Sequence, residues 1–240
     1  RYMADDDFVP VPIKGLIAKD YLERRAQLLR GDDALPEVAP GRPAFDHALN
    51  LADDESIEFP STSHISLTDR YGNVLSMTTT IENAFGSRLM VRGFLLNNEL
   101  TDFSFRSHED GVPVANRVEP GKRPRSSMAP TIVLKDGAPV LILGSPGGSR
   151  IIGYVVKAII AHLDWKMDVQ QAVSLPNMVN RFGVFDVEAG LVSPRLTAEL
   201  EAMGYAVSSR PMVSGLQAIA IGEVLRGGAD PRREGIALGE

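Results

Sequence analysis

The 240-residue sequence contains no cysteine and only four histidines. The absence of cysteine excludes disulfide frameworks, cysteine-ligated zinc sites and thiol nucleophiles, but it leaves the redox compartment open. The histidines His47, His64, His108 and His162 are scattered without the spacing of metal ligands, so no metal site is expected. His162 lies in an apolar helical segment, where we expect a hydrogen-bonded core histidine.

The sequence also lacks a basic patch and an apolar segment at its start. Nucleic acid is therefore not expected as a partner, because such binding needs clustered lysine and arginine. Residues 1–7 have no apolar region of a signal peptide, and methionine stands third, so the start predicts an excised fragment. With 44% hydrophobic and 23% charged residues, the composition excludes a disordered, collagen-like or membrane-spanning chain.

Charge and proline are unevenly distributed. Residues 1–61 hold 13 of the 31 acidic residues, 7 of the 25 basic residues and 6 of the 16 prolines. The net charge of −6 therefore belongs to this part, and the remaining residues are balanced. Such asymmetry marks a tail, a linker or a separate unit. Residues 31–61 have no sustained hydrophobic period and are expected to be either an exposed, mobile connection or an ordinary surface loop.

Hydrophobic spacing predicts helices over residues 13–30, 151–163 and 194–203, the last with Ser193 as its N-cap. Alternating residues predict β-hairpins over residues 65–81 and 131–143. Strand pairs followed by helices, without regular βαβ alternation, predict an α+β fold and not a doubly wound parallel sheet.

Four polar clusters could carry chemistry. On composition alone, residues 61–64 are expected to form a turn, residues 97–102 a capped turn and residues 123–128 a loop. Residues 144–150 lie between a predicted strand and a predicted helix. They match neither GxxxxGK[ST] nor GxGxxG, so a nucleotide site is weakly supported. An oxyanion hole fits better, because backbone donors aimed at a developing negative charge need the conformational freedom and close approach that glycine allows.

Taken together and in order, these clusters resemble the small subunit of the γ-glutamyltranspeptidases. The resemblance runs from Thr62 to the end and is carried by residues 62–66, 69–73, 78–80, 85–87, 95–104, 122–131, 144–150 and 228–233. Residues 1–61 resemble the last stretch of the large subunit. The resemblance implies an N-terminal nucleophile hydrolase with an αββα four-layer sandwich, its large-subunit half mostly missing, and a division into residues 1–61 and 62–240.

The resemblance also implies a self-cleaving precursor. By position, the cut falls between Ser61 and Thr62 and exposes Thr62 as the nucleophile. An N-terminal threonine carries its own base, an α-amino group with a reference pKa of roughly 7.7–8.0. Thr80 matches a second threonine that orients the nucleophile's hydroxyl. Gly147 and Gly148 match the glycines of the oxyanion hole.

Two pairs of residues match the family's substrate-binding positions. Glu99 and Asp102 match an acidic pair that holds the α-amino group of a γ-glutamyl substrate, as carboxylates facing an ammonium should. Ser126 and Ser127 match the serines that bind its α-carboxylate. The implied reaction is acyl transfer from glutathione or a related γ-glutamyl amide to water or an amino acid, without a cofactor.

The chain departs from the family's pattern at three places. Glu82 replaces an asparagine that contacts the substrate's amino end, Thr101 replaces a common aspartate, and residues 103–121 lack a lid tyrosine. These departures also suit the cephalosporin (glutaryl) acylase-like relatives on the same fold, which are the second functional hypothesis.

A third hypothesis is an inactive, unprocessed fragment, because nothing in residues 1–61 matches the large-subunit arginine that binds the α-carboxylate. The isolated chain is therefore expected to lack full activity. The large subunit of the same precursor is the expected partner, with a homo-oligomer as a further alternative. The resemblance also implies a periplasmic or secreted location.

Overall fold

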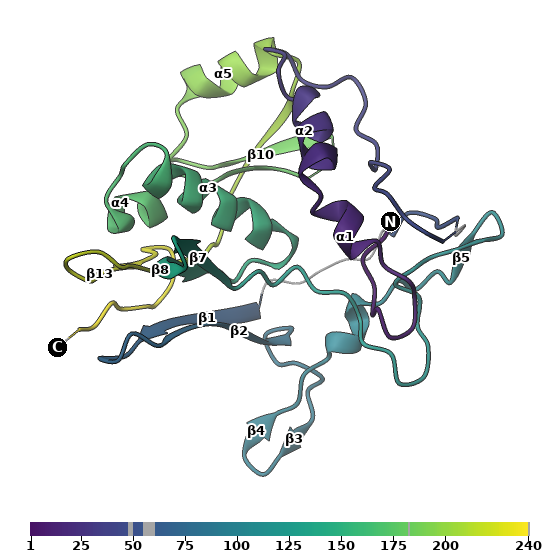
Figure 1. The fold of residues 1–240 in the computed structure, drawn as a ribbon, viewed down its shortest axis with the longest axis horizontal. Helices are drawn as coiled ribbons and strands as arrows, with labels where there is room; N and C mark the ends of the chain where they lie inside the picture. The colour runs from purple at the N-terminus through teal and green to yellow at the C-terminus, as the bar shows by residue number, and fades with distance from the viewer. Residues whose placement is uncertain (48–49, 55–60, 182, 240) are drawn as a thin grey trace. The chain divides into compact units, whose positions relative to one another are not determined.

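The computed structural model describes residues 1–47, 50–54, 61–181 and 183–239 (Figure 1). The chain divides into two compact units that alternate along the sequence. Unit 1 comprises Arg1–Glu58, Glu99–Ser126 and Ala202–Tyr205. Unit 2 comprises Phe59–Asn98, Ser127–Glu201 and Ala206–Glu240.

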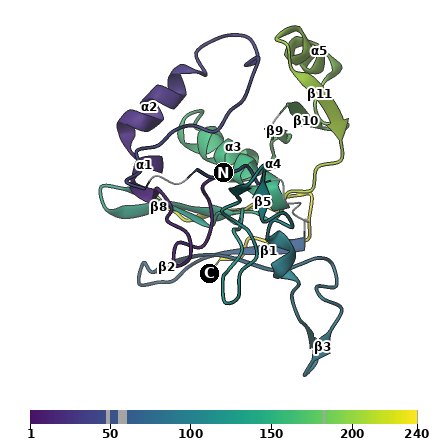
Figure 2. The same ribbon diagram turned by 90° about the vertical axis from the view of Figure 1, so that its right-hand side faces the viewer.

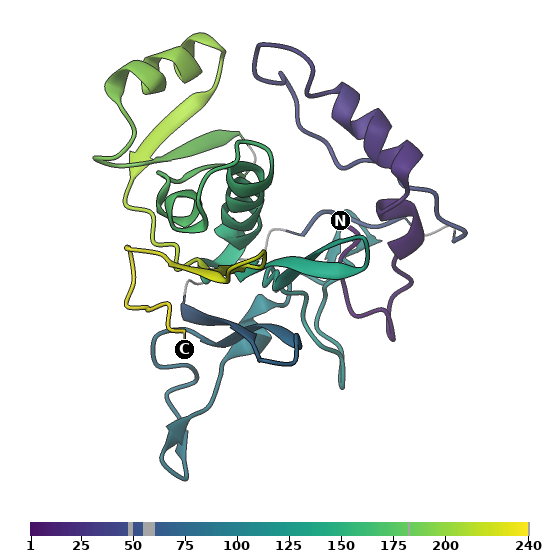
Figure 3. The same cartoon turned by 60° about the vertical axis from the view of Figure 1, so that its left-hand side comes forward.

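Unit 2 is layered, with helices over a four-stranded sheet and a hairpin beneath that sheet (Figures 1 and 3). The sheet is antiparallel and has the order β13 (Arg226–Ala229), β12 (Gln217–Ala220), β8 (Ala138–Gly144), β7 (Thr131–Lys135). Helices α3 (Ile151–Leu163) and α4 (Val169–Ser174) contact this sheet, and so does the hairpin of β1 (Ser61–Thr68) and β2 (Val74–Glu82). Helix, sheet and hairpin thus give three successive layers.

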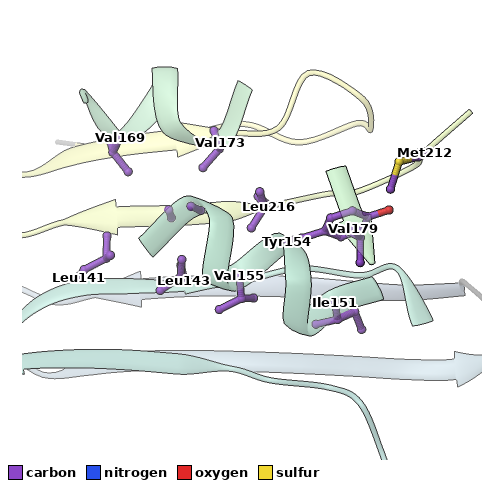
Figure 4. Close-up of a cluster of buried hydrophobic side chains, with 12 residues drawn as sticks. Leu141, Leu143, Ile151, Tyr154, Val155, Val169, Val173, Val179, Met212 and Leu216 are labelled. Carbon is purple, nitrogen blue, oxygen red and sulfur yellow. The ribbon is translucent and has the colours of Figure 1, made fainter. Parts of the chain in front are cut away.

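The centre of unit 2 is a sheet covered on both faces. Leu141, Ile142 and Leu143 are consecutive on β8, and each is at most 1% exposed, which requires cover on either side. Leu141 and Leu143 belong to a cluster with Ile151 and Tyr154 of α3 (Figure 4). Burying each large apolar side chain of this kind contributes about 1.5–3 kcal/mol.

The hairpin β1–β2 buries its polar face and exposes its apolar one. The Ser66 hydroxyl donates to the Gln217 carbonyl at 3.1 Å, and the Ser76 hydroxyl donates to the Leu143 carbonyl at 3.0 Å. On the opposite face, four apolar side chains are 39–52% exposed: Ile65, Leu67, Leu75 and Met77. The polar face is held against the sheet by specific hydrogen bonds, so the layer contact depends on geometry as well as on apolar burial.

Three smaller groups of elements complete unit 2. Strands β9 (Met178–Asn180), β10 (Val184–Glu188) and β11 (Ala206–Arg210) form a sheet in which β10 and β11 are parallel. Helix α5 (Pro194–Ala202) lies between these two strands in sequence. The short hairpin of β3 (Met90–Val91) and β4 (Phe94–Leu95) projects from the body of the unit (Figure 2).

Unit 1 contains two short helices and short extended segments around a small core. The helices are α1 (Ile13–Leu16) and α2 (Lys19–Gln27), the 3₁₀ helix η1 spans Glu99–Asp102, and β5 (His108–Glu109) pairs with β6 (Val112–Pro113). Val9, Leu51 and Ala115 form the buried cluster. Among the described residues of the whole chain, no helix is long and apolar enough to cross a membrane.

Several sequence-based expectations are confirmed. The hairpin over residues 131–143 is β7–β8, and the helix over residues 151–163 has the expected bounds. Helix α5 ends one residue early, and the Ser193 hydroxyl accepts from the Leu196 N–H at 3.2 Å, as an N-cap should. His162 is part-buried, with Nδ1 at 2.9 Å from the Met167 carbonyl oxygen.

Two expectations are wrong. The helix over residues 13–30 breaks into α1 and α2, because Ala18 is extended, with φ −64° and ψ 129°. Gly15 lies so close to the Ala44 backbone that a Cβ would be 2.1 Å from its carbonyl oxygen, so tertiary contact fixes α1 separately. Residues 61–64 are not a turn but the start of β1, because their partners on β2 complete the ladder.

The connection over residues 31–61 is only in part the exposed segment that was expected. Residues 35–40 are exposed, whereas Leu51 is 4% and Ala52 9% exposed. Asp54 accepts from Arg125 Nε at 2.7 Å. Residues 48–49 and 55–60 lie outside the described residues, so the expectation is not tested there.

Candidate active site

The first residues of β1 form a chain of hydroxyl contacts with β2. Thr62 is 7% exposed and stands opposite Thr80, with a register shift between Ser61 and Thr62. The Thr62 hydroxyl donates to Thr80 Oγ1 at 3.1 Å, and the Thr80 hydroxyl donates to the Ser61 carbonyl at 2.9 Å. The Glu82 N–H also donates to Thr80 Oγ1, at 2.8 Å. The Thr80 side chain thus links the Thr62 hydroxyl to the carbonyl that precedes it.

The hydrogen bonds in this series run in one direction. A threonine hydroxyl has one proton to donate, and Thr80 gives its proton to the Ser61 carbonyl. The Thr62 hydroxyl then supplies the hydrogen bond that Thr80 Oγ1 accepts. The same contacts polarise the Ser61 carbonyl and orient the oxygen of Thr62 beside it.

Glu82 ends β2 in a strained conformation. Its φ is +70°, a left-handed value that is uncommon for a residue with a side chain, and the residue is 2% exposed. Asn98 holds it in place by donating from Nδ2 to its carboxylate, and the Asn98 side-chain carbonyl accepts from the Asn83 N–H at 3.1 Å. The sequence analysis did not assign Asn98 a role of its own, although it lies in the polar cluster of residues 97–102.

His64 packs between the hairpin and the four-stranded sheet. Its Nδ1 lies 2.8 Å from Thr78 Oγ1 and its Nε2 lies 3.1 Å from Ser66 Oγ. A Cβ on Gly144 would be 2.2 Å from the imidazole ring, so only glycine fits there. Burial lowers the pKa of His64 from 6.5 to about 4, so the ring is neutral near pH 7. The sequence analysis concluded that the histidines are not metal ligands, and it gave His64 no other role.

The glycine segment follows directly from β8. Gly147 and Gly148 are buried and have positive φ values of 139° and 59°. A Cβ on Gly147 would lie 2.6 Å from the Tyr154 ring, so glycine is required both by conformation and by space. The 3₁₀ helix η2 (Gly148–Arg150) follows and runs into α3. Backbone N–H groups at such a helix start suit an oxyanion.

The acidic pair lies on η1 in unit 1. Asp102 is 6% exposed and Glu99 is half-buried. The main chain there is anchored by Asn116, which is fully buried and donates from Nδ2 to the Asp102 carbonyl at 2.7 Å. Asn116 Oδ1 accepts from the Arg125 N–H at 2.9 Å, so one amide connects η1 to the segment before Ser126. Sequence analysis missed Asn116, because a single buried asparagine in a loop carries no local signal.

The predicted site residues divide between the two units. Unit 2 contains Ser61, Thr62, Thr80, Glu82, Ser127, Gly147 and Gly148. Unit 1 contains Glu99, Asp102 and Ser126. Among the residues that the structure describes, no group of three or more histidine, aspartate and glutamate side chains could hold a metal ion.

The C-terminal segment at residues 228–233 is tied to unit 2 by a buried polar network. Asp230 is 1% exposed and accepts from the Ser214 hydroxyl and from Arg232. Arg232 also donates to both carboxylate oxygens of Glu188. Breaking such a buried network leaves charges without compensation, which is strongly destabilising.

Comparison with known proteins places these observations in a family. The family model for gamma-glutamyltranspeptidase matches residues 1–240. The glutathione hydrolase proenzyme of Bacillus subtilis is 39% identical over 252 residues, covering 99% of this chain and 42% of that protein. The acylase ACY 1 proenzyme of a Pseudomonas species is 34% identical over 221 residues, covering 90% of this chain and 36% of that protein.

A solved structure of a gamma-glutamyltranspeptidase is also similar to this chain. A mutant of the Helicobacter pylori gamma-glutamyltranspeptidase superposes with a TM-score of 0.66 at 38% identity, covering 71% of this chain and 99% of that chain. The expected α+β fold of the N-terminal nucleophile hydrolases is thereby confirmed. The chain spans about two fifths of the length of the curated relative from Bacillus subtilis. With the family model matched over all 240 residues, this chain belongs to the gamma-glutamyltranspeptidase family.

Proposed function

We propose that this chain carries the nucleophile of a γ-glutamyl acyl transfer, and that Thr62 is that nucleophile after cleavage of the peptide bond between Ser61 and Thr62. The hydrogen-bonded series from Thr62 Oγ1 through Thr80 Oγ1 to the Ser61 carbonyl is the observation that carries the proposal. It supports an attack on the neighbouring carbonyl, because the nucleophilic oxygen is oriented and the carbonyl is polarised by the same hydroxyl.

Cleavage proceeds in two steps. Thr62 Oγ1 adds to the Ser61 carbonyl carbon, the hydroxyl proton passes to the departing nitrogen, and the Ser61–Thr62 C–N bond breaks to leave an ester. The first step frees the α-amino group of Thr62. Water then hydrolyses the ester, which gives a Ser61 carboxylate and restores the Thr62 hydroxyl. The amide nitrogen of the uncut chain cannot accept a proton, so cleavage creates the base.

Turnover then uses the same hydroxyl. The α-amino group takes the Thr62 proton, the oxygen attacks the γ-carbonyl of glutathione or a related γ-glutamyl amide, and the amine leaves with a proton. Water or an amino acid releases the γ-glutamyl group from the ester. Gly147 and Gly148 stabilise the tetrahedral oxyanion through their N–H groups.

We assign the substrate's two charged ends to the two polar pairs. Glu99 and Asp102 hold the α-ammonium group, and Ser126 and Ser127 hold the α-carboxylate. Two carboxylates facing one ammonium give charge-assisted hydrogen bonds, which are about twice as strong as neutral ones. The proposed partner is the large subunit of the same precursor. The proposed location is the periplasm or the medium.

A second candidate is an acylase acting on glutaryl side chains. It is favoured by the similarity to the acylase ACY 1 proenzyme. The buried Glu82 carboxylate acts against this candidate, because negative charge near the substrate's amino end favours a γ-glutamyl group, with its ammonium, over a glutaryl group without one.

The test uses the full-length polypeptide that contains these residues, as wild type, Thr62→Ala and Thr80→Val, with Thr80→Ser as the matched control. We expect intact mass to show cleavage before Thr62 in the wild type and in Thr80→Ser, no cleavage in Thr62→Ala, and cleavage slowed roughly 10²–10³-fold in Thr80→Val. Release of anilide from γ-glutamyl and glutaryl substrates separates the two candidates. Strong turnover by Thr62→Ala contradicts both.

A further inference from the structure

Arg233 reaches the first residues of β1 from the far end of the chain. Its Nη1 donates to the main-chain carbonyl of Thr62 at 3.1 Å, across 171 residues of sequence. Its stem lies beside Gly215, where a Cβ would be 3.0 Å from Arg233 Cδ and 2.6 Å from Pro146 Cγ. Arg233 therefore contacts the Thr62 backbone from a position beside Gly215, a residue that also adjoins Pro146 in the loop leading to Gly147.

The backbone that carries Arg233 is fixed by the buried network around Asp230. The Leu216 N–H donates to Asp230 at 3.2 Å, and the Arg233 N–H approaches the Asp230 carbonyl at 3.5 Å. Arg232, the neighbour of Arg233, donates to Glu188 and to the Leu175 carbonyl at 2.9 Å. Because its backbone is held in this way, the guanidinium of Arg233 has a defined position next to Thr62.

We propose that Arg233 is a positioning residue for Thr62, which fixes the carbonyl of that residue and places a permanent positive charge close to its nitrogen. This inference rests on the proposed function, because the nitrogen matters only if it becomes the α-amino base. A guanidinium stays protonated at every pH at which proteins are folded. A nearby positive charge disfavours the ammonium form of the amine, so the neutral base persists to lower pH.

Burial increases the effect of this charge. Arg233 is half-buried, so water is partly removed from its guanidinium, and this burial lowers the pKa of Arg233 from its ordinary value. Less water means less screening of its charge at the neighbouring nitrogen. The side chain nevertheless remains a cation, because its ordinary pKa lies far above the working range.

Several other ionisable groups lie near Thr62 and Arg233. Glu82 stands opposite Ser61 at the end of β2, and Asp230 and Tyr154 favour the charged form of Arg233. His64 on β1 is neutral above about pH 4, so it does not titrate in the same range as the amine. Arg150 on η2 is held by Asp186 at 2.6 Å.

The test measures kcat/KM against pH for the full-length, self-cleaved protein as wild type, Arg233→Gln and Arg233→Lys. The acidic limb of this profile reports the base of the free enzyme. We expect Arg233→Gln, which keeps a hydrogen-bond donor but loses the charge, to move that limb upward by about half a pH unit. Arg233→Lys should leave the limb near its wild-type position. Arg226→Gln is the matched control, because Arg226 is an exposed arginine on β13 whose removal changes the net charge equally.

Two outcomes overturn the inference: an acidic limb that stays in place in Arg233→Gln, or one that moves as far in Arg226→Gln. Either result can be obtained while the wild type is cleaved and active, so it does not touch the proposed function. If Arg233→Gln does not cleave itself, the profile is measured on protein assembled from two co-expressed chains, the second beginning at Thr62 after removal of its initiator methionine. An uncleaved or inactive wild type instead contradicts the proposed function.

Discussion

At the scale of single residues, Thr80 is the position where the site is most constrained. Its hydroxyl oxygen contacts Thr62, the Ser61 carbonyl and the Glu82 N–H, which saturates a group with one proton and two lone pairs. Valine has nearly the same shape but none of these contacts, and serine keeps them. The difference between those two substitutions therefore measures the hydroxyl and not the packing.

His64 makes stability depend on pH. The folded state holds the imidazole neutral, with its pKa lowered by burial to about 4, whereas an exposed histidine titrates at 6.5. Between these values the unfolded chain binds a proton that the folded chain does not, so stability is lost as the pH falls from about 6.5 to about 4. The full loss, reached below about pH 4, is about 3 kcal/mol.

This dependence can be isolated with His64→Gln, which cannot titrate. Urea unfolding of both proteins is followed between pH 7 and pH 4. We expect the free energy of unfolding to fall more steeply in the wild type than in the variant, because carboxylates contribute equally to both. Equal slopes would show that His64 is not kept neutral by the fold.

At the scale of elements, the acidic pair depends on how η1 is held in unit 1. A 3₁₀ helix of four residues has little stability of its own. The Asn116 side chain supplies the missing restraint through the Asp102 carbonyl and the Arg125 N–H, and Asn116 Nδ2 also donates to Asp54 at 2.9 Å. The main chain at the proposed substrate-binding pair is therefore anchored by a buried amide.

The substitution Asn116→Ala should consequently affect binding more than the chemical step. We expect the KM for a γ-glutamyl anilide to rise about tenfold with a much smaller change in kcat, because the reacting groups are on β1 and β2 and not on η1. Asn73→Ala is the matched control, since Asn73 is an exposed asparagine in the turn of the β1–β2 hairpin. A fall in kcat at constant KM would contradict this assignment.

At the scale of the whole molecule, the β1–β2 hairpin of the layered unit leaves an apolar face exposed to solvent. Ile65, Leu67, Leu75 and Met77 alternate with residues that point to the four-stranded sheet. An apolar surface of this kind promotes association in water. We expect the 240-residue chain produced alone to bind the dye ANS and to self-associate with rising concentration.

Two charges placed on this face should reverse that behaviour. The double variant Leu67→Lys with Met77→Lys is expected to reduce ANS fluorescence and to shift the sedimentation profile toward the monomer. Ile236→Lys is the control, because Ile236 is 70% exposed near the C-terminus and outside the hairpin. An undiminished ANS signal in the double variant would show that the dye binds elsewhere.

The sequence by itself determined the elements whose signals are local. The hairpin β7–β8, the helix α3 and the N-cap of α5 follow from alternation, helical spacing and a serine before a proline. The order of the polar segments also identified the family, because several long motifs do not recur in one order by chance. The glycine-rich segment between a strand and a helix was also located from the sequence, and the structure gives Gly147 and Gly148 positive φ values there.

Only the tertiary structure decided which distant residues meet. Composition favoured a turn at residues 61–64, and cross-strand partners on β2 made them a strand. Hydrophobic spacing favoured one helix over residues 13–30, and the approach of Gly15 to Ala44 accompanies its division into two. Asn116 and Arg233 acquire their contacts from groups 14 and 171 residues away. Such contacts leave no periodic trace in the chain, because a hydrogen bond depends on where two atoms lie in space and not on how far apart they stand in sequence.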